Sequence, residues 1–428
     1  MHRPLPPVSL RWLAGLLLLL IGATAALAAP GTFDPVAETE KLLATLPAAQ
    51  RLRSDAYFEG GYWLLLWEPL VTLLIAWLLY RTGLAVRLRD TAERVFKRRF
   101  LQAILFVALL SMILWAMNLP WGFYTGFIRE HQYGLSNQTA GAWLGESLIG
   151  LVPTLFLSCP VGALLYLAIR RSPQRWWLAA SAATPFFLLL LIVIAPVFIA
   201  PLFNTYQPLT DTRVRDPILS MARANGVPVD NVYQFDASKQ TNRISANVNG
   251  AFRTIRVSLN DNLLTRCSPE EVQAVMAHEL GHYVLNHVYK LVIYLSLLFA
   301  AGFAFTHYFF AAVVRRWGAR WSLRGIDDLA GLPLLLAGLS IFLLLAAPIQ
   351  NTIIRTTESE ADIFGLNAAR QPDAFATAAL KVADYRKLAP GRWEEIALFD
   401  HPSGRQRILM AMQWKAENLA EIAAKEEN

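Results

Sequence analysis

Residues 268–287, SPEEVQAVMAHELGHYVLNH, carry the pattern around which the rest of the chain is organised. His278-Glu279-Leu280-Gly281-His282 is an H-E-x-x-H motif. Histidines four residues apart lie on one face of a helix, where two ring nitrogens can bind one zinc ion, and Glu279 lies beside them to act on water. The alternative is a pair of helix histidines that only pack against their neighbours.

The flanking residues predict a helix that begins after Ser268. Serine is a favourable N-cap, and Pro269 suits the first helical position. We expect this helix to run through His287 and on into the apolar residues 288–314. His287 lies about half a turn round from His278, so we interpret it as structural and not as a ligand.

Zinc catalysis needs a third protein ligand and an open position for water. A candidate segment, residues 355–362 (RTTESEAD), is expected to be helical. Glu358 and Asp362 are four residues apart and share a face, whereas Glu360 points away. We therefore expect Glu358 to be the third ligand and Asp362 to be the partner of a zinc-binding histidine. Taken alone, the segment could equally be a solvated acidic helix face.

The composition excludes a soluble globular protein. Of 428 residues, 55% are hydrophobic and only 17% are charged, where a cytosolic domain has about 25% charged residues. Apolar segments long enough to span a bilayer lie at residues 61–80, 101–121, 143–169, 176–199, 288–314 and 329–349. Two cysteines, Cys159 and Cys267, exclude a disulfide framework and a thiolate metal site.

The basic residues predict the orientation in the membrane. The net charge is +7, but Lys and Arg collect beside the apolar segments, in residues 81–99, 170–175 and 315–324. That distribution argues against a nucleic-acid partner. If these three connections lie inside, the polar residues 204–287 and the C-terminal tail lie outside, on the periplasmic face of a bacterial inner membrane.

The chain divides into six parts. They are residues 1–28, a signal peptide or a first transmembrane helix; 29–56, an N-terminal linker; 57–203, four transmembrane helices; 204–287, the first part of a zinc protease domain; 288–351, two transmembrane helices; and 352–428, the second part of that domain with the third ligand. Residues 204–284 are expected to be α+β, with an amphipathic helix at 213–224 and strands at 231–235 and 254–259.

At this point the chain resembles the type 1 CAAX prenyl protease family, a group of membrane-embedded gluzincin zinc endopeptidases. The further residues that carry the resemblance are Leu119-Pro120-Trp121 with Tyr124, Phe127, Glu130, Gly134, Gln138 and Thr139; Pro201-Leu202-Phe203-Asn204; Asp261 with Leu263-Leu264; and His401-Pro402 with Arg407-Ile408. It covers roughly residues 57–413 and is carried by four ordered motifs.

The resemblance implies a fold and a set of roles. The fold is an integral membrane protein, mainly α, whose six transmembrane helices after the leader form a helical barrel around a water-filled chamber, with a split α+β gluzincin-like domain at one rim. One zinc ion per chain would bind His278, His282 and Glu358, and His401 and Arg407 would stabilise the oxyanion. Without it, His401 would be a loop histidine and Arg407 a surface cation.

The resemblance also implies how substrate is held. The edge strand that binds the substrate backbone in gluzincins maps onto Ser245, Ala246 and Asn247, with Ser245 replacing the usual Asn. Glu68, Glu130 and Glu146 lie near span ends and are expected to face a cavity, because facing lipid would be costly.

The expected activity is hydrolysis of peptide bonds in membrane-associated peptides or proteins, including lipidated CAAX-type C-termini, with membrane lipids as neighbours. A general quality-control protease of the membrane or envelope is an alternative. A membrane sensor with a metallopeptidase-like domain is another, but no regulatory appendage is visible after Gln413. A transporter with a soluble lid would leave the zinc and base residues unexplained.

Overall fold

The computed structural model describes residues 33–250, 255–420 and 422, and the expected leader lies outside them. The helices are α2 (Pro35–Ala44), α3 (Ala48–Arg81), α4 (Leu84–Val95), α5 (Arg99–Phe123), α6 (Arg129–Gln132), α7 (Ala140–Arg171), α8 (Trp176–Ile194), α9 (Thr212–Ala224), α10 (Asp261–Arg266), α11 (Pro269–Val284), α12 (His287–Trp317), α13 (Leu332–Ala369), α14 (Pro372–Val382), α15 (Arg392–Leu398) and α16 (Gly404–Glu417). Short π and 3-10 turns join several of them, including Tyr124–Ile128, Ala195–Ile199, Ala200–Leu202, Ala237–Lys239 and Leu329–Gly331.

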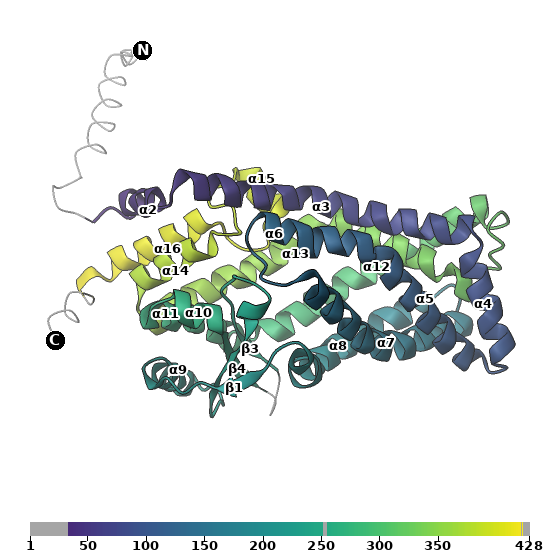
Figure 1. The fold of residues 1–428 in the computed structure, drawn as a ribbon, viewed down its shortest axis with the longest axis horizontal. Coiled ribbons are helices and arrows are strands. Elements are labelled where there is room, and N and C mark those ends of the chain that lie inside the picture. The colour runs from purple at the N-terminus through teal and green to yellow at the C-terminus, as the bar shows by residue number, and fades with distance from the viewer. Residues whose placement is uncertain (1–32, 251–254, 421, 423–428) are drawn as a thin grey trace, which may run out of the picture.

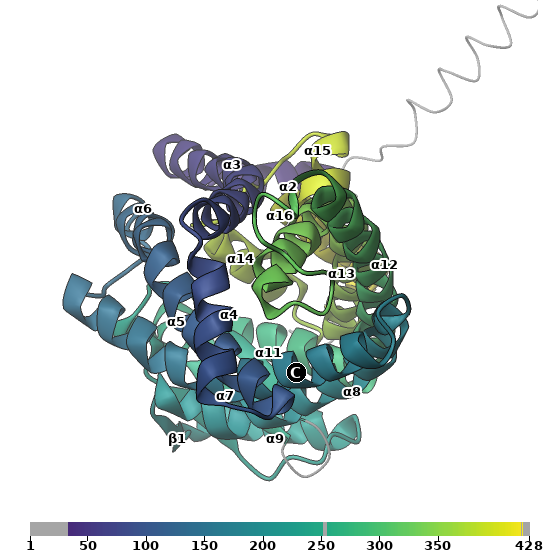
Figure 2. The same ribbon diagram turned by 90° about the vertical axis from the view of Figure 1, so that its right-hand side faces the viewer.

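Six helical segments in the described part of the chain are long and apolar enough to cross a membrane, as predicted. They are Ala48–Arg81, Arg99–Gln132, Ala140–Arg171, Trp176–Leu202, His287–Trp317 and Leu329–Ala369. Their helices contact one another in the order α3, α5, α7, α8, α12, α13, and α13 contacts α3. The six helices therefore form a closed ring, which Figure 2 shows along its axis.

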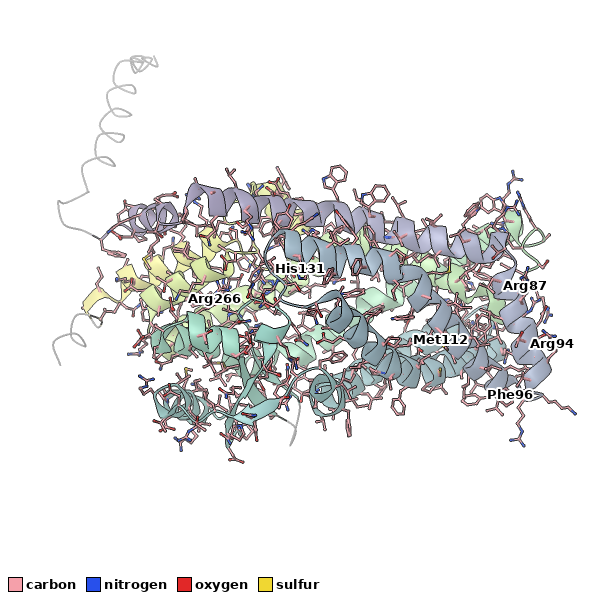
Figure 3. The ribbon with its side chains drawn as sticks, viewed as in Figure 1. Arg87, Arg94, Phe96, Met112, His131 and Arg266 are labelled. Carbon is pink, nitrogen blue, oxygen red and sulfur yellow. The ribbon has the colours of Figure 1, made fainter. Side chains whose placement is uncertain are left out.

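The basic connections gather at one end of this ring. Figure 1 places α4 at that end and the strands at the other. The strands belong to the polar body, which we define as residues 204–250, 255–286 and 352–420. Figure 3 shows Arg87 and Arg94 far from Arg266 of this polar body. The buried Arg89 of α4 pairs with the buried Asp328, with 2.7 Å between Nη1 and Oδ2. Separation of the two residues would leave an uncompensated buried charge, which strongly destabilises a protein. The pair therefore holds α4 across this end of the ring.

At the opposite end, a four-stranded sheet has the order β1-β2-β4-β3. The strands are β1 (Tyr206–Pro208), β2 (Val232–Phe235), β3 (Ala246–Asn249) and β4 (Arg256–Asn260). β2 and β4 are parallel, whereas β1 and β3 pair antiparallel with their neighbours. The predicted strands and the amphipathic helix, α9, are thus present, and β3 is left at an edge of the sheet.

Three expectations about element boundaries need correction. The helix of the H-E-x-x-H motif ends at Val284, because Asn286 takes a left-handed conformation with φ of 57°. The linker 29–56 contains α2 and the start of α3, because Leu43 packs in one apolar cluster with α14 and α16. The boundary at 351/352 falls inside α13, which runs unbroken from the ring into the polar body.

Candidate metal centre

Two helices of the polar body, α11 and α13, approach each other closely at glycines. A Cβ on Gly281 would lie 3.3 Å from the backbone of Ala361, and one on Gly365 would lie 2.9 Å from the backbone nitrogen of His278. The capping box of Ser268 and Glu271 fixes the start of α11. The motif histidines of α11 therefore lie directly against the acidic residues of α13.

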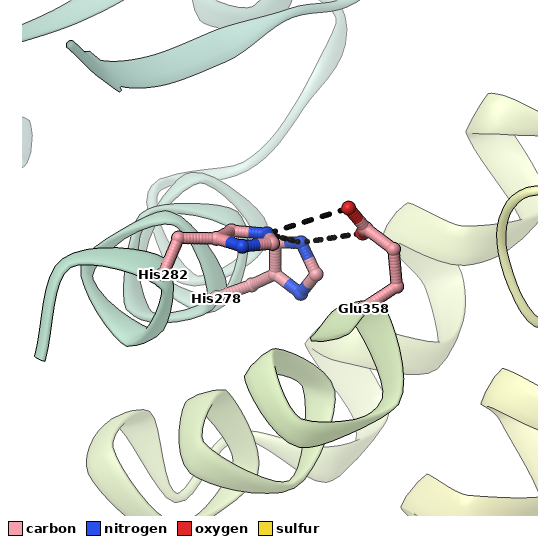
Figure 4. Close-up of side chains that lie close together, drawn as sticks. All are labelled: His278, His282 and Glu358. Atoms are coloured by element: carbon pink, nitrogen blue, oxygen red, sulfur yellow. Dashed lines mark hydrogen bonds and ion pairs between the residues drawn. The ribbon is translucent and has the colours of Figure 1, made fainter. Parts of the chain in front are cut away.

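The three residues predicted as ligands come together. Nε2 of His278 lies 3.3 Å from Oε2 of Glu358, and Nε2 of His282 lies 3.5 Å from Oε1. One ligand atom from each residue falls within 4.8 Å of the others, as Figure 4 shows for the side chains. Two imidazole nitrogens and one carboxylate are the donor set of many catalytic zinc sites, so these residues fit the metal that the sequence predicts.

A chain of contacts supports the first histidine. Nδ1 of His278 lies 2.7 Å from Oδ1 of the fully buried Asp362. The Asp362 carboxylate in turn accepts hydrogen bonds from Nε and Nη2 of Arg407, at 2.9 and 2.6 Å. Such outer contacts orient a metal-binding imidazole. Asp362 thus occupies its expected position, while two of the three nitrogens of Arg407 are already engaged.

A second chain, which the sequence did not predict, supports His282. Its Nδ1 lies 3.0 Å from Nδ1 of His287, and Nε2 of His287 lies 2.9 Å from Oε2 of Glu360. If Glu360 accepts the Nε2 proton, Nδ1 of His287 accepts the Nδ1 proton of His282, which leaves Nε2 of His282 free for a metal. His287 lies outside the ligand triad, but it contacts a member of it.

The electrostatics of α11 suit a proton acceptor beside a metal. Burial raises the pKa of Glu279 to about 7, near the pH at which general bases work best. Burial and His278 lower the pKa of His282 to about 4. Burial opposes a charge on His278, but Asp362 and Glu358 outweigh it and raise its pKa to about 9, so a metal ion that binds Nε2 must displace a proton from this imidazole.

His401 reaches the same group of side chains from the loop after α15. Its Nε2 lies 3.2 Å from Oε2 of Glu358, and its Nδ1 lies 2.9 Å from Oδ1 of Asp400. Arg355 of α13 holds this loop, since its Nη1 donates to the carbonyls of Glu395, at 2.8 Å, and Phe399, at 2.5 Å. Asp400 was not among the expected residues, and its place directly before His401 was the available signal.

One cavity of about 320 Å³ is lined by the three candidate ligands and by Glu279, His401 and Arg407, together with the start of the edge strand. Ser245 and Ala246 line it. The backbone N–H of Asn260 donates to the backbone carbonyl of Ser245 at 2.9 Å. Because hydrogen-bonded and non-hydrogen-bonded pairs alternate along antiparallel strands, the backbone groups of Ser245 and Asn247 face β4, and those of Ala246 face the free edge of the sheet. Of the three predicted substrate-binding residues, Ala246 is therefore the one whose backbone N–H and C=O are free to pair with a substrate strand.

A second cavity of about 620 Å³ lies between the ring and the polar body. Glu130 and Glu146 line it, as expected, whereas Glu68 is exposed. Glu130 pairs with Arg243 at 2.7 Å and accepts a hydrogen bond from Tyr57 at 2.6 Å. Because Arg243 lies three residues before the first residue of the edge strand β3, Ala246, this contact connects the start of the strand to the membrane helices.

Comparison with known proteins agrees with this geometry. Residues 208–415 match the model of peptidase family M48, and residues 38–205 match the model described as the CAAX prenyl protease N-terminal region with five membrane helices. An uncharacterised metalloprotease of Bacillus subtilis, YhfN, is 32% identical over 346 residues, which are 79% of this chain and 80% of the relative. CAAX prenyl protease 1 of Saccharomyces cerevisiae is 30% identical over 197 residues, 46% of this chain and 44% of the relative.

A solved structure has the same fold. The crystal structure of S. mikatae Ste24p superposes with a TM-score of 0.69, covers 87% of this chain and 93% of its own, and is 21% identical. The family matches and the relative of similar length establish the membership of this chain. The chain belongs to peptidase family M48 and is a multi-pass membrane zinc metalloprotease that acts on peptides or proteins.

Proposed function

We propose that the group formed by His278, His282 and Glu358 binds one zinc ion per chain and is the catalytic centre of an endopeptidase. The observation that carries this proposal is the convergence of these three donors, within 4.8 Å, in a cavity that Glu279 also lines. Zinc held there would supply Lewis acidity to water and to the scissile carbonyl.

Glu279 is the proton carrier of the proposed reaction. Its half-buried carboxylate takes the proton from the attacking water, and it then delivers that proton to the leaving amine. A pKa of about 7 allows the carboxylate to perform both transfers near neutral pH.

His401 and Arg407 stabilise the negative oxygen that develops on the scissile carbonyl. Asp400 holds Nδ1 of His401 at 2.9 Å, so Nε2 lies on the side of the cavity, 3.2 Å from Oε2 of Glu358. With that carboxylate held by a zinc ion, Nε2 would be free to donate to the oxyanion. Arg407 uses Nε and Nη2 for Asp362; in the described part of the chain its Nη1 has no hydrogen-bond partner. Preorganised donors of this kind act most strongly where water is excluded.

The substrate backbone adds to the free edge of β3. Ala246 presents its backbone N–H and C=O there, and main-chain pairing of this type supplies affinity without demanding a particular sequence. Ser245, at the position where the family resemblance implies an Asn, lines the wall of the cavity. Asn247 is one residue farther along β3, and its backbone is engaged with β4.

The leading substrates are membrane-associated peptides, including lipidated CAAX-type C-termini, presented at the periplasmic face of a bacterial inner membrane. The support for this orientation is that the basic connections gather at the end of the ring opposite the cavity. Accessibility labelling of single cysteines in residues 204–250 of spheroplasts checks it, and absence of label from outside would contradict it.

The activity is tested with a quenched farnesylated CAAX peptide and its unprenylated twin, using zinc-loaded wild type and Glu279→Gln. Cleavage of the farnesylated peptide alone, lost in the variant, supports CAAX-type specificity. Equal Glu279-dependent cleavage of both points to a broad membrane-surface protease, which suits quality control. Full hydrolysis by Glu279→Gln with zinc still bound would show the assigned mechanism to be wrong.

A further inference from the structure

The cavity at the metal centre continues along one face of α14. Phe375, Ala378, Ala379 and Val382 line it, and their spacing places them on a single helical face. Leu263 and Val275 complete this apolar part of the wall. An apolar side chain next to the scissile bond therefore fits here, since burial of its surface is favourable.

Arg386 lines the same cavity, four residues beyond the last residue of this apolar face. Within the described ranges it forms no hydrogen bond or ion pair. It acts electrostatically on Asp400, but the carboxylate of Asp400 is engaged by His401. A half-buried guanidinium with unused donors is unusual, because arginine in such sites normally pairs.

The neighbouring cations, in contrast, are all engaged by carboxylates. The pairs are Arg407 with Asp362, Arg243 with Glu130, Arg266 with Asp384, Lys381 with Glu271, and Lys387 with Glu59 and Glu394. The charge of Arg386 thus remains available for an anion that enters the cavity.

The position of Arg386 indicates which part of a substrate reaches it. The hydroxyl of the adjacent Tyr385 donates to the carbonyl of Ile244 at 3.4 Å. The segment after α14 that carries Tyr385 and Arg386 therefore lies beside the beginning of the edge strand. A peptide that pairs antiparallel with β3, as β4 does on the other side, runs with its C-terminal end toward Ile244. The residues after the scissile bond then approach Arg386.

We propose that Arg386 binds the free α-carboxylate of the substrate and restricts cleavage to bonds a few residues from a C-terminus. The inference rests on the proposed function and adds to it the residue that reads the terminus, independently of any lipid. The planar guanidinium can donate two parallel hydrogen bonds to a carboxylate, which an amidated terminus cannot accept equally. The released product is a short C-terminal peptide with an apolar first residue.

The test uses two quenched peptides, both farnesylated if wild type cleaves only the farnesylated form, that are identical except for a free carboxylate or an amide at the C-terminus. For zinc-loaded wild type we expect a KM about tenfold or more lower for the free acid, the size of a charge-assisted hydrogen bond. Arg386→Gln should raise the KM of the acid to that of the amide and leave the amide unchanged, while Arg386→Lys keeps part of the preference. Arg405→Gln, whose arginine pairs with Glu40 at 2.6 Å, is the matched control and should keep the wild-type ratio.

Equal cleavage of the two peptides by wild type, or a preference that survives in Arg386→Gln, would overturn the inference. Should Arg386→Gln fail to fold, inhibition of wild type by the free-acid and amidated product peptides decides the question, since only the acid should compete well. The Glu279→Gln variant distinguishes failure of the role of Arg386 from failure of the proposed catalytic mechanism. Glu279-dependent cleavage without terminus preference rejects only the role of Arg386, whereas cleavage that persists in Glu279→Gln rejects the proposed mechanism itself.

Discussion

Gly365 of α13 touches the backbone of His278, and a Cβ there would lie 2.9 Å from the His278 nitrogen and 3.1 Å from its Cα. Backbone atoms cannot yield as the end of a flexible side chain can, so a larger residue must separate the two helices. The distance between His278 and Glu358, and with it the geometry of the metal centre, depends on this contact.

Gly365→Ala should therefore weaken zinc binding and lower kcat/KM by about 100-fold, the effect of displacing catalytic groups by about 1 Å. Competition with a zinc chelator and peptide hydrolysis measure the two effects. The control is Gly141→Ala in α7, where a Cβ meets nothing within 4 Å and alanine should be neutral or slightly stabilising. Unchanged zinc affinity in Gly365→Ala would contradict this account.

Spacing alone predicts the features of the site that lie within one helix, whereas the meeting of Glu358 with the motif histidines was expected from the need for a third zinc ligand, and that of His401 and Arg407 from the family resemblance. Residues four apart share a face whatever surrounds the helix, so the pairing of His278 with His282, and of Glu358 with Asp362, follows from spacing alone. The N-cap at Ser268 and the six apolar spans are similarly local. These are the elements that the structure reproduces.

The features that could not be predicted depend on contacts between distant segments. The left-handed conformation of Asn286 ends α11 and brings His287 back toward His282, whereas on a continuous helix five residues would place the two on different faces. The contact of Arg407 with Asp362 spans 45 residues, and the packing of α2 against α16 spans most of the chain. No periodicity of the sequence indicates them.

The contact of His287 with His282 predicts a role in metal affinity. His287→Ala removes the acceptor that fixes the tautomer of His282, and loss of such an outer partner weakens metal binding by about 10–100-fold. Zinc titration against a fluorescent chelator measures this change. His131→Ala, at an exposed histidine, should bind zinc like the wild type. An affinity unaltered in His287→Ala would leave His287 with a packing role only.

Arg355 predicts a separate effect on turnover. Its guanidinium holds the carbonyls of Glu395 and Phe399, directly before the loop with His401. Arg355→Met keeps the aliphatic stem but frees that loop, so kcat should fall by about tenfold or more as the oxyanion donor is misplaced, with zinc affinity near that of the wild type. If Arg355→Met also lost zinc affinity, the lower kcat would instead come from a displacement of α13, which carries Glu358.

Glu271 predicts a stability effect that depends on pH. Its carboxylate is buried at the start of α11, where Oε2 accepts from Ser268 N at 2.7 Å and pairs with Lys381 at 2.5 Å. Burial opposes the charge, but Lys381 and Ser268 outweigh it and lower the pKa of Glu271. A lowered pKa in the folded state stabilises the fold above the ordinary glutamate value of about 4.3, and this contribution disappears as the pH falls through the folded-state pKa.

Glu271→Gln keeps an acceptor for Ser268 but loses the charge that pairs with Lys381, so it should destabilise the protein by about 1.5–3 kcal/mol at pH 7. Thermal unfolding in detergent, followed by tryptophan fluorescence from pH 8 down to pH 3, should show the Tm of the variant below that of wild type at neutral pH and the two converging in acid. Glu270→Gln, at the exposed neighbour in the same first turn, removes the same charge and should cost less than about 1 kcal/mol. A gap that widens as the pH falls would mean that the Glu271 carboxylate is neutral in the folded protein.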